Sequence, residues 1–107
     1  MSAVAASPNV IAATESGTLF TNEGATAENC HTLPSAVAGL QVEFYCQDAD
    51  GIKITAATGD TIRTSTGVSA AAGYIQTLTQ YSWIRLRAIN ATEWVQMCEG
   101  GTWTIDS

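Results

Sequence analysis

Apolar and polar residues alternate with a period of two along several short stretches of this chain. In residues 42–47, Val42, Phe44 and Cys46 share one face, while the residues between them are polar or amphipathic. The same period recurs in residues 52–56 and 82–89. Alternation of this kind is typical of a β-strand with one buried face. No stretch longer than about ten residues has the period of an α-helix.

Turn residues divide the chain into short strands. Asp50-Gly51 predicts a tight hairpin between the strands on either side of it, because glycine tolerates the positive φ of such a turn. Asn90 predicts another turn. Pro34 ends a strand, since proline has no amide hydrogen for the ladder. The expected strands are 18–22, 30–33, 42–47, 52–56, 61–64, 74–79, 82–89, 93–98 and 102–105.

Together these elements predict an all-β fold, a compact antiparallel β-sandwich or jelly-roll-like barrel of about eight short strands. Residues 1–17 are small and polar and lack a steady period. We expect them to form an extended N-terminal arm that orders against another subunit, with a flexible terminus as the alternative. The expected organisation is therefore an arm over residues 1–17 and a β-sandwich domain over residues 18–107.

The composition indicates a thin hydrophobic core. The chain has 107 residues, the size of one domain, and 17 of them are alanine. Alanine contributes little free energy on burial, and the 15 threonines favour strands over helices. A small core of this kind is often completed by a partner subunit, so we expect an obligate oligomer.

The net charge of −6 excludes two classes of partner. Lys53, Arg63, Arg85 and Arg87 are the only cations, and no basic run could release the counterions of a nucleic acid. An anionic membrane surface repels an acidic chain, and no apolar stretch approaches the roughly 20 residues that span a bilayer. The first ten residues contain no Lys or Arg, unlike a secretion signal, so we expect the chain to fold in a cytoplasm.

One motif is similar to a metal site. Asp48-x-Asp50-Gly51 resembles the start of a calcium loop, but such a loop needs further oxygen ligands and a carboxylate at its end. Ile52 and Ile54 occupy that region as a strand. We therefore interpret the motif as a turn, while a weak structural ion between subunits stays open.

The remaining reactive residues give no catalytic pattern. Cys30 and His31 are adjacent, so on a strand their side chains point to opposite faces and cannot form a dyad. Cys30, Cys46 and Cys98 have no metal-like spacing, and we expect reduced thiols. The sequon Asn90-Ala91-Thr92 is interpreted as a hairpin turn. We expect no catalytic residue, no cofactor and no metal.

The strand at residues 82–89 has an unusual outer face. Trp83, Arg85 and Arg87 alternate with inward apolar residues, so half of the cations lie beside a tryptophan on one face. Trp and Arg are enriched in the cores of protein interfaces. We predict that these three residues form a subunit or capsid interface, in which the arginines pair with acids of a neighbouring copy. The alternative is that Trp83 packs under a loop and the arginines offset local acids.

Three groups of segments have characteristic turn and strand motifs: 20–26, then 32–34 with 38–40, 47–51 and 59–62, and finally 88–94 with 101–104. Together these motifs resemble a small β-rich structural module of tailed bacteriophages, found in capsid decoration or cement proteins and in related head- or tail-fibre domains. The resemblance covers about residues 18–105. Cys30, Cys46 and Cys98 depart from the family pattern, which more usually has Val, Thr or Ser at these positions.

The resemblance implies a non-enzymatic virion protein that assembles as a homotrimeric β-sandwich. For a chain of one module, we expect a cement protein on the outer capsid surface, assembled in a bacterial host cytoplasm. Its partners would be the major capsid protein at threefold positions and other copies of itself. Multivalent attachment would stabilise the shell, and the arm could add strands to capsid sheet edges.

Two other classes of protein stay open from the sequence. A head-fibre or tail-fibre module that binds a receptor or glycan would present aromatic residues such as Tyr74, Tyr81 and Trp94 in a groove. A cellular β-sandwich adaptor would share the composition without the phage-like motifs.

Overall fold

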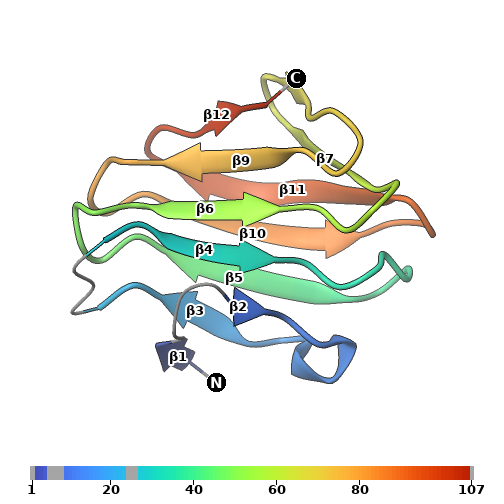
Figure 1. The fold of residues 1–107 in the computed structure, drawn as a ribbon, viewed down its shortest axis with the longest axis horizontal. Helices are drawn as coiled ribbons and strands as arrows, with labels where there is room; N and C mark the ends of the chain where they lie inside the picture. The colour runs from blue at the N-terminus through green and yellow to red at the C-terminus, as the bar shows by residue number, and fades with distance from the viewer. Residues whose placement is uncertain (1, 5–8, 24–26, 107) are drawn as a thin grey trace.

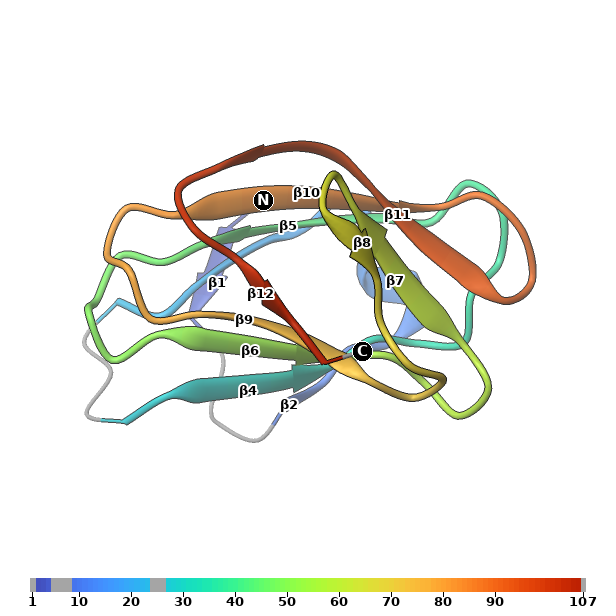
Figure 2. The same ribbon diagram turned by 90° about the horizontal axis from the view of Figure 1, so that it is seen from above.

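Two β-sheets stack face to face in the computed structural model of the chain, and their strands run roughly along its long axis (Figures 1 and 2). The structure describes residues 2–4, 9–23 and 27–106. Their regular structure consists of strands and one short 3-10 helix, η1, at Ala13–Glu15. The all-β fold predicted from the alternation is confirmed.

Seven strands form the first sheet, here called sheet A. Their order across the sheet is β1-β3-β5-β10-β11-β7-β8. The central strand β10 pairs antiparallel with both of its neighbours, whereas β1–β3, β3–β5 and β7–β11 are parallel pairs. The bounds are β1 Ser2–Val4, β3 Leu19–Thr21, β5 Gln41–Tyr45, β7 Thr61–Thr64, β8 Gly67–Val68, β10 Trp83–Ala88 and β11 Glu93–Gly100.

Five strands form the second sheet, sheet B, in the order β12-β9-β6-β4-β2. Here β4 pairs parallel with both β2 and β6, and β9 pairs antiparallel with β6 and β12. The bounds are β2 Asn9–Val10, β4 Asn29–Thr32, β6 Ile52–Thr55, β9 Tyr74–Thr77 and β12 Thr104–Ile105. Both sheets are mixed and the described residues form twelve strands, so the expectation of about eight antiparallel strands was wrong.

The turn at Asp50-Gly51 joins the two sheets and does not form the predicted hairpin. The strand before it, β5, belongs to sheet A, and the strand after it, β6, belongs to sheet B. Both strands still turn an apolar face inward, because Phe44 and Ile54 are fully buried. Alternation is the same for a hairpin and for two strands that face each other across a core, so the pattern could not separate the two. The hairpin predicted at Asn90 does form, between β10 and β11.

The core lies between the sheets and follows the predicted faces. Val42, Phe44 and Cys46 are at most 1% exposed, as are Ile84 and Leu86 of β10. The aromatic rings of Phe20 and Phe44 stack at 5.6 Å between centroids. Further fully buried residues come from both sheets and their connections: Ile11, Leu33, Ile52, Ile54, Ile62, Ile75 and Trp94.

The N-terminal segment belongs to the sandwich wherever the structure describes it. β1 pairs with β3 at one edge of sheet A, and β2 pairs with β4 at one edge of sheet B. Ile11 follows β2 and is 1% exposed. We expected residues 1–17 to form an extended arm; β1, β2 and Ile11 contact the sandwich of their own chain. The division into an arm over residues 1–17 and a domain over residues 18–107 stays a prediction, and residues 1 and 5–8 lie outside the described residues.

Candidate interaction surface

The outer face of the central strand β10 carries the predicted site residues. Trp83, Arg85 and Arg87 alternate with Ile84 and Leu86, which are fully buried. Directly opposite residues on paired strands point to the same side of a sheet. The partners of the three are therefore on the outer face too: Tyr45, Glu43 and Gln41 on β5, and Gly100, Cys98 and Val95 on β11. We call this set the outer A face.

Trp83 is held in place by its own sheet. Its cross-strand partner is Gly100, where a Cβ atom would lie 2.1 Å from the indole Nε1, so the ring covers a position that only glycine permits. Trp103 Nε1–H donates to the carbonyl oxygen of Trp83 at 3.1 Å. Trp83 is nevertheless 40% exposed. The tryptophan is thus a fixed apolar surface that keeps a large area open to solvent, and the alternative of packing under a loop is not seen.

The two arginines of the site differ in their surroundings. Arg85 Nη2 donates to Glu43 Oε2 at 3.2 Å, across the β5–β10 pair. Arg87 is exposed and has no ion pair within the described part of the chain. We predicted that the arginines pair with acids of a neighbouring copy; Arg85 has a carboxylate partner in its own chain. Arg87 is the cation on this face that stays available to a partner molecule.

A β-bulge adds an apolar residue beside these groups. The register between β10 and β11 shifts between Arg85 and Leu86, and Met97 is the extra residue on β11. Met97 is 48% exposed, and its neighbour Cys98 is half-buried. The sequence predicted the strand but not Met97 as a surface residue, because a bulge shows only once the partner strand is known.

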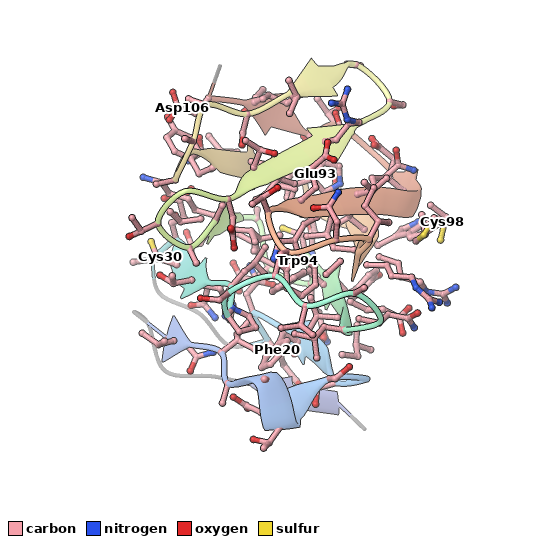
Figure 3. All side chains as sticks on the ribbon, turned by 90° about the vertical axis from the view of Figure 1, so that its right-hand side faces the viewer. Phe20, Cys30, Glu93, Trp94, Cys98 and Asp106 are labelled. Atoms are coloured by element: carbon pink, nitrogen blue, oxygen red, sulfur yellow. The ribbon has the colours of Figure 1, made fainter. Side chains whose placement is uncertain are left out.

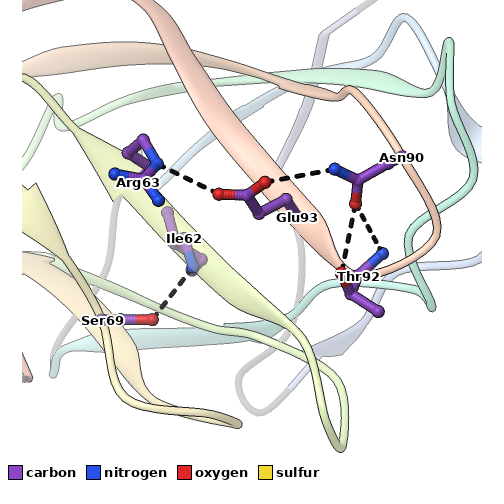
Figure 4. Close-up of polar contacts among 6 residues, drawn as sticks. All are labelled: Ile62, Arg63, Ser69, Asn90, Thr92 and Glu93. Atoms are coloured by element: carbon purple, nitrogen blue, oxygen red, sulfur yellow. Dashed lines mark hydrogen bonds and ion pairs between the residues drawn. The ribbon is translucent and has the colours of Figure 1, made fainter.

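A polar network fixes the β10–β11 turn beside the face (Figure 4). Asn90 Oδ1 accepts hydrogen bonds from the amide and hydroxyl of Thr92, and Asn90 Nδ2 donates to Glu93 Oε1 at 3.1 Å. Arg63 Nε donates to Glu93 Oε2 at 3.0 Å. The bonds from Asn90 and Arg63 lower the pKa of Glu93. The sequon Asn90-Ala91-Thr92 is therefore a hydrogen-bonded turn, as predicted.

Cys30 and His31 point to opposite faces, as their adjacency predicted. His31 is 1% exposed and packs against the rings of both Phe20 and Phe44, with centroids 5.4 and 5.2 Å away. Asn9 Nδ2 lies 3.2 Å from its Nδ1. Burial lowers the pKa of His31 from 6.5 to about 4, so the ring is neutral near pH 7. His31 is a core residue.

The cysteines do not converge within the described residues. Figure 3 shows Cys30 and Cys98 on opposite outer sides of the sandwich, and Cys46 is buried between the sheets. None of the three forms a disulfide in the structure. Burial raises the pKa of the Cys46 thiol, which keeps it protonated and unreactive.

The Asp48–Gly51 segment is a turn held by a buried amide. Asp48 Oδ1 accepts the amide hydrogen of Asp50 at 3.1 Å. Asn22 is fully buried and bonds the backbone of Asp48 in both directions at 2.8 Å. Within the described residues no three or more His, Cys, Asp or Glu side chains are grouped so as to hold a metal ion. These residues also include no helix with the length and hydrophobicity needed to cross a bilayer.

The three aromatic residues expected in a binding groove lie apart. Trp94 is fully buried in the core, where Figure 3 places it between the sheets. Tyr74 lies on sheet B under Lys53, whose Nζ is 4.2 Å from the ring centroid. Tyr81 is 65% exposed in the connection before β10. The groove proposed for a receptor-binding module does not form from these residues.

A cleft opens between the far edges of the two sheets. Its volume is about 360 Å³ and it is lined by Thr66, Gly67, Val68, Trp103, Thr104 and Ile105. The backbones of the two sheets meet beside it, where the amide of Ala70 donates to the carbonyl oxygen of Asp106 at 2.7 Å. The lining carries no charged side chain, so it has no group suited to acid–base chemistry.

Comparison with known proteins adds no assignment. No family model matches the sequence, and no curated protein matches it significantly.

Proposed function

We propose that this chain is a non-enzymatic structural protein of a tailed-bacteriophage virion. In this proposal it is a homotrimeric cement or decoration protein that binds the major capsid protein on the outer capsid surface, at threefold positions, and stabilises the shell. The resemblance of residues 18–105 to the phage structural module supports the assignment, as does an all-β fold with an apolar core. The proposal requires no cofactor and no nucleic acid.

The observation that carries the proposal is the outer A face. A central strand in a seven-stranded sheet presents a fixed, 40% exposed Trp83 and an exposed Arg87. Trp and Arg are both enriched in the cores of protein interfaces. Trp83 and Arg87 lie on one face of the central strand with Arg85 between them, and Arg87 has no ion pair among the described residues. A surface for binding protein is the function that this arrangement supports best.

Two measurements test the proposal. Light scattering coupled to gel filtration is expected to give three times the chain mass of 11.2 kDa; a stable monomer would refute the homotrimer. Cryo-electron microscopy of virions that carry the protein is expected to show its density at capsid threefold positions. Density on the tail would replace the cement role with the alternative of a fibre module.

A further inference from the structure

One end of the sandwich is acidic. Glu23 follows β3, and Asp48 and Asp50 lie in the connection from β5 to β6. Figure 2 shows that connection at the end of the sandwich where β10 begins. Glu23 and Asp50 are exposed, and no ion pair joins any of the three carboxylates to a cation among the described residues. We call Glu23, Asp48 and Asp50 the acidic end.

This end has a rigid backbone. The side chain of Asn22 is fully buried and bonds to the backbone of Asp48 and to the carbonyl oxygen of Gly51 at 3.2 Å. The bond from the amide of Asp50 to Asp48 Oδ1 adds a further constraint. A preorganised segment loses little conformational entropy on binding. The acidic end is therefore ready to contact a basic surface without reordering its backbone.

The outer A face has the opposite charge. It holds Arg85 and Arg87, and by strand register the same side of the sheet continues with Arg63 on β7 and Glu93 on β11. The outer A face with this extension carries three of the four cations of a chain with net charge −6. The carboxylates on it are Glu43 and Glu93, and each is already bonded to an arginine. Arg87 is the one arginine of this face that has no carboxylate partner among the described residues, so the face is complementary to a carboxylate of another molecule.

We propose that the outer A face of one copy binds the acidic end of a second copy, a contact that rests on the homotrimer proposed above. Arg87 pairs with the carboxylates of Asp50 and Glu23 of the neighbour, and the exposed surface of Trp83 packs against its turn. A guanidinium bonds a carboxylate through two parallel donors, which orients the contact as well as strengthening it. Copies of a chain with net charge −6 repel one another. The contact offsets this repulsion because it places carboxylates of one copy against an arginine of the next.

The positions of the two surfaces favour a closed ring. Trp83 pairs with Tyr45, and the chain reaches Asp48 only three residues further on, so the Trp83 end of the outer A face adjoins the acidic end. Arg87 lies opposite Gln41, at the other end of β10. Head-to-tail contacts close into a ring when the rotation between copies permits it and otherwise grow into filaments. When the two contacting surfaces lie on adjacent sides of one molecule, each copy is rotated by a large angle relative to the copy it binds. A large rotation between neighbours closes a ring after few copies, as in a trimer.

Charge reversal tests the contact. Sedimentation of Arg87→Glu and of the double variant Glu23→Lys with Asp50→Lys is expected to show self-association weaker by at least about tenfold in each case. All three substituted side chains are exposed, so the substitutions remove no core contact, and each variant should keep the β-sheet circular dichroism of the original chain. Combining the three substitutions in one chain exchanges the charges across the contact and is expected to restore the oligomer.

Two charge-reversal variants away from the contact serve as controls, and three outcomes would contradict the proposals. Lys53→Glu reverses a cation on sheet B and Asp106→Lys an acid after β12, and neither should weaken association. An acidic-end variant that still forms trimers, beside an Arg87→Glu variant that does not, overturns this contact and leaves the homotrimer standing. A folded triple variant that stays dissociated also overturns it. An original chain that sediments as a monomer overturns both proposals.

Discussion

The outer faces of the two sheets come from strands with the same alternation, yet they carry different chemistry. Sheet A presents an exposed Trp83 and Arg87, which has no carboxylate partner among the described residues. On sheet B the outward residues of β4, β6 and β9 are half-buried, and its cation, Lys53, lies over the ring of Tyr74. The outward residues of these three strands are Cys30, Thr32, Lys53, Thr55, Tyr74 and Gln76.

This difference shows what makes one face of a sandwich a binding surface. On sheet B the cation and the aromatic ring satisfy each other within the chain, so little is left to bind. On sheet A the aromatic ring rests on Gly100 and the nearest cation, Arg85, is held by Glu43, which leaves Trp83 and Arg87 unmatched. Each face has an aromatic ring and a cation, and the pairing of these groups within the chain decides which face is available.

The largest expected effect concerns the inner side of sheet B, where His31 makes that sheet sensitive to acid. The folded chain keeps His31 neutral down to a pKa of about 4, while the unfolded chain protonates it near 6.5. Between these values the unfolded state binds more protons. The stability that comes from keeping His31 neutral is therefore fully present above pH 6.5 and is lost as the pH falls towards 4. The loss amounts to about 3 kcal/mol in the free energy of unfolding.

Urea unfolding of the original chain and of His31→Leu at pH 7 and pH 4.5 measures this loss. The original chain should lose more stability on acidification than the variant, because leucine does not titrate. Equal losses in both proteins would show that His31 does not govern the acid response.

The next largest effect is expected from a substitution of Gly100, the residue on sheet A that supports Trp83. Gly100→Ala places a methyl group inside the space of the Trp83 ring and should lower the free energy of unfolding by about 1–3 kcal/mol. The displaced indole should also weaken self-association. In a Trp83→Leu background the same substitution should cost clearly less, which chemical unfolding of the four proteins can measure. An equal cost in both backgrounds would remove the proposed support of Trp83 by Gly100.

The smallest effects compare the internal pairs of the two faces. Lys53→Met removes the cation above Tyr74 and should cost about 0.5–1 kcal/mol of stability. A double-mutant cycle on Arg85 and Glu43 should give a coupling of about 0.2–1 kcal/mol, because both side chains are partly exposed. High salt should weaken the Arg85–Glu43 coupling more than the interaction of Lys53 with Tyr74. A coupling of several kcal/mol on sheet A would mean that the pair is far better shielded than its exposure indicates.

The sequence by itself predicted nine of the twelve strands in the described residues, β3 to β7 and β9 to β12, and the buried faces of the longer ones. Alternation at residues 42–47 and 82–89 was sufficient, because a period of two assigns each side chain to one side of a strand. It also identified Trp83, Arg85 and Arg87 as outward residues, and it separated Cys30 from His31. These are local properties of the chain, and the structure retains them.

The tertiary structure decided which strands pair. The Asp50-Gly51 turn crosses between sheets, and β1 and β2 pair at the edges of sheet A and sheet B, neither of which the turn chemistry or the composition could specify. Only strand register gave Arg85 a carboxylate in its own chain and left Arg87 without one. Pairing between strands depends on contacts between residues that are far apart in the sequence, whereas alternation depends only on residues that are adjacent in it. The candidate interface follows from both.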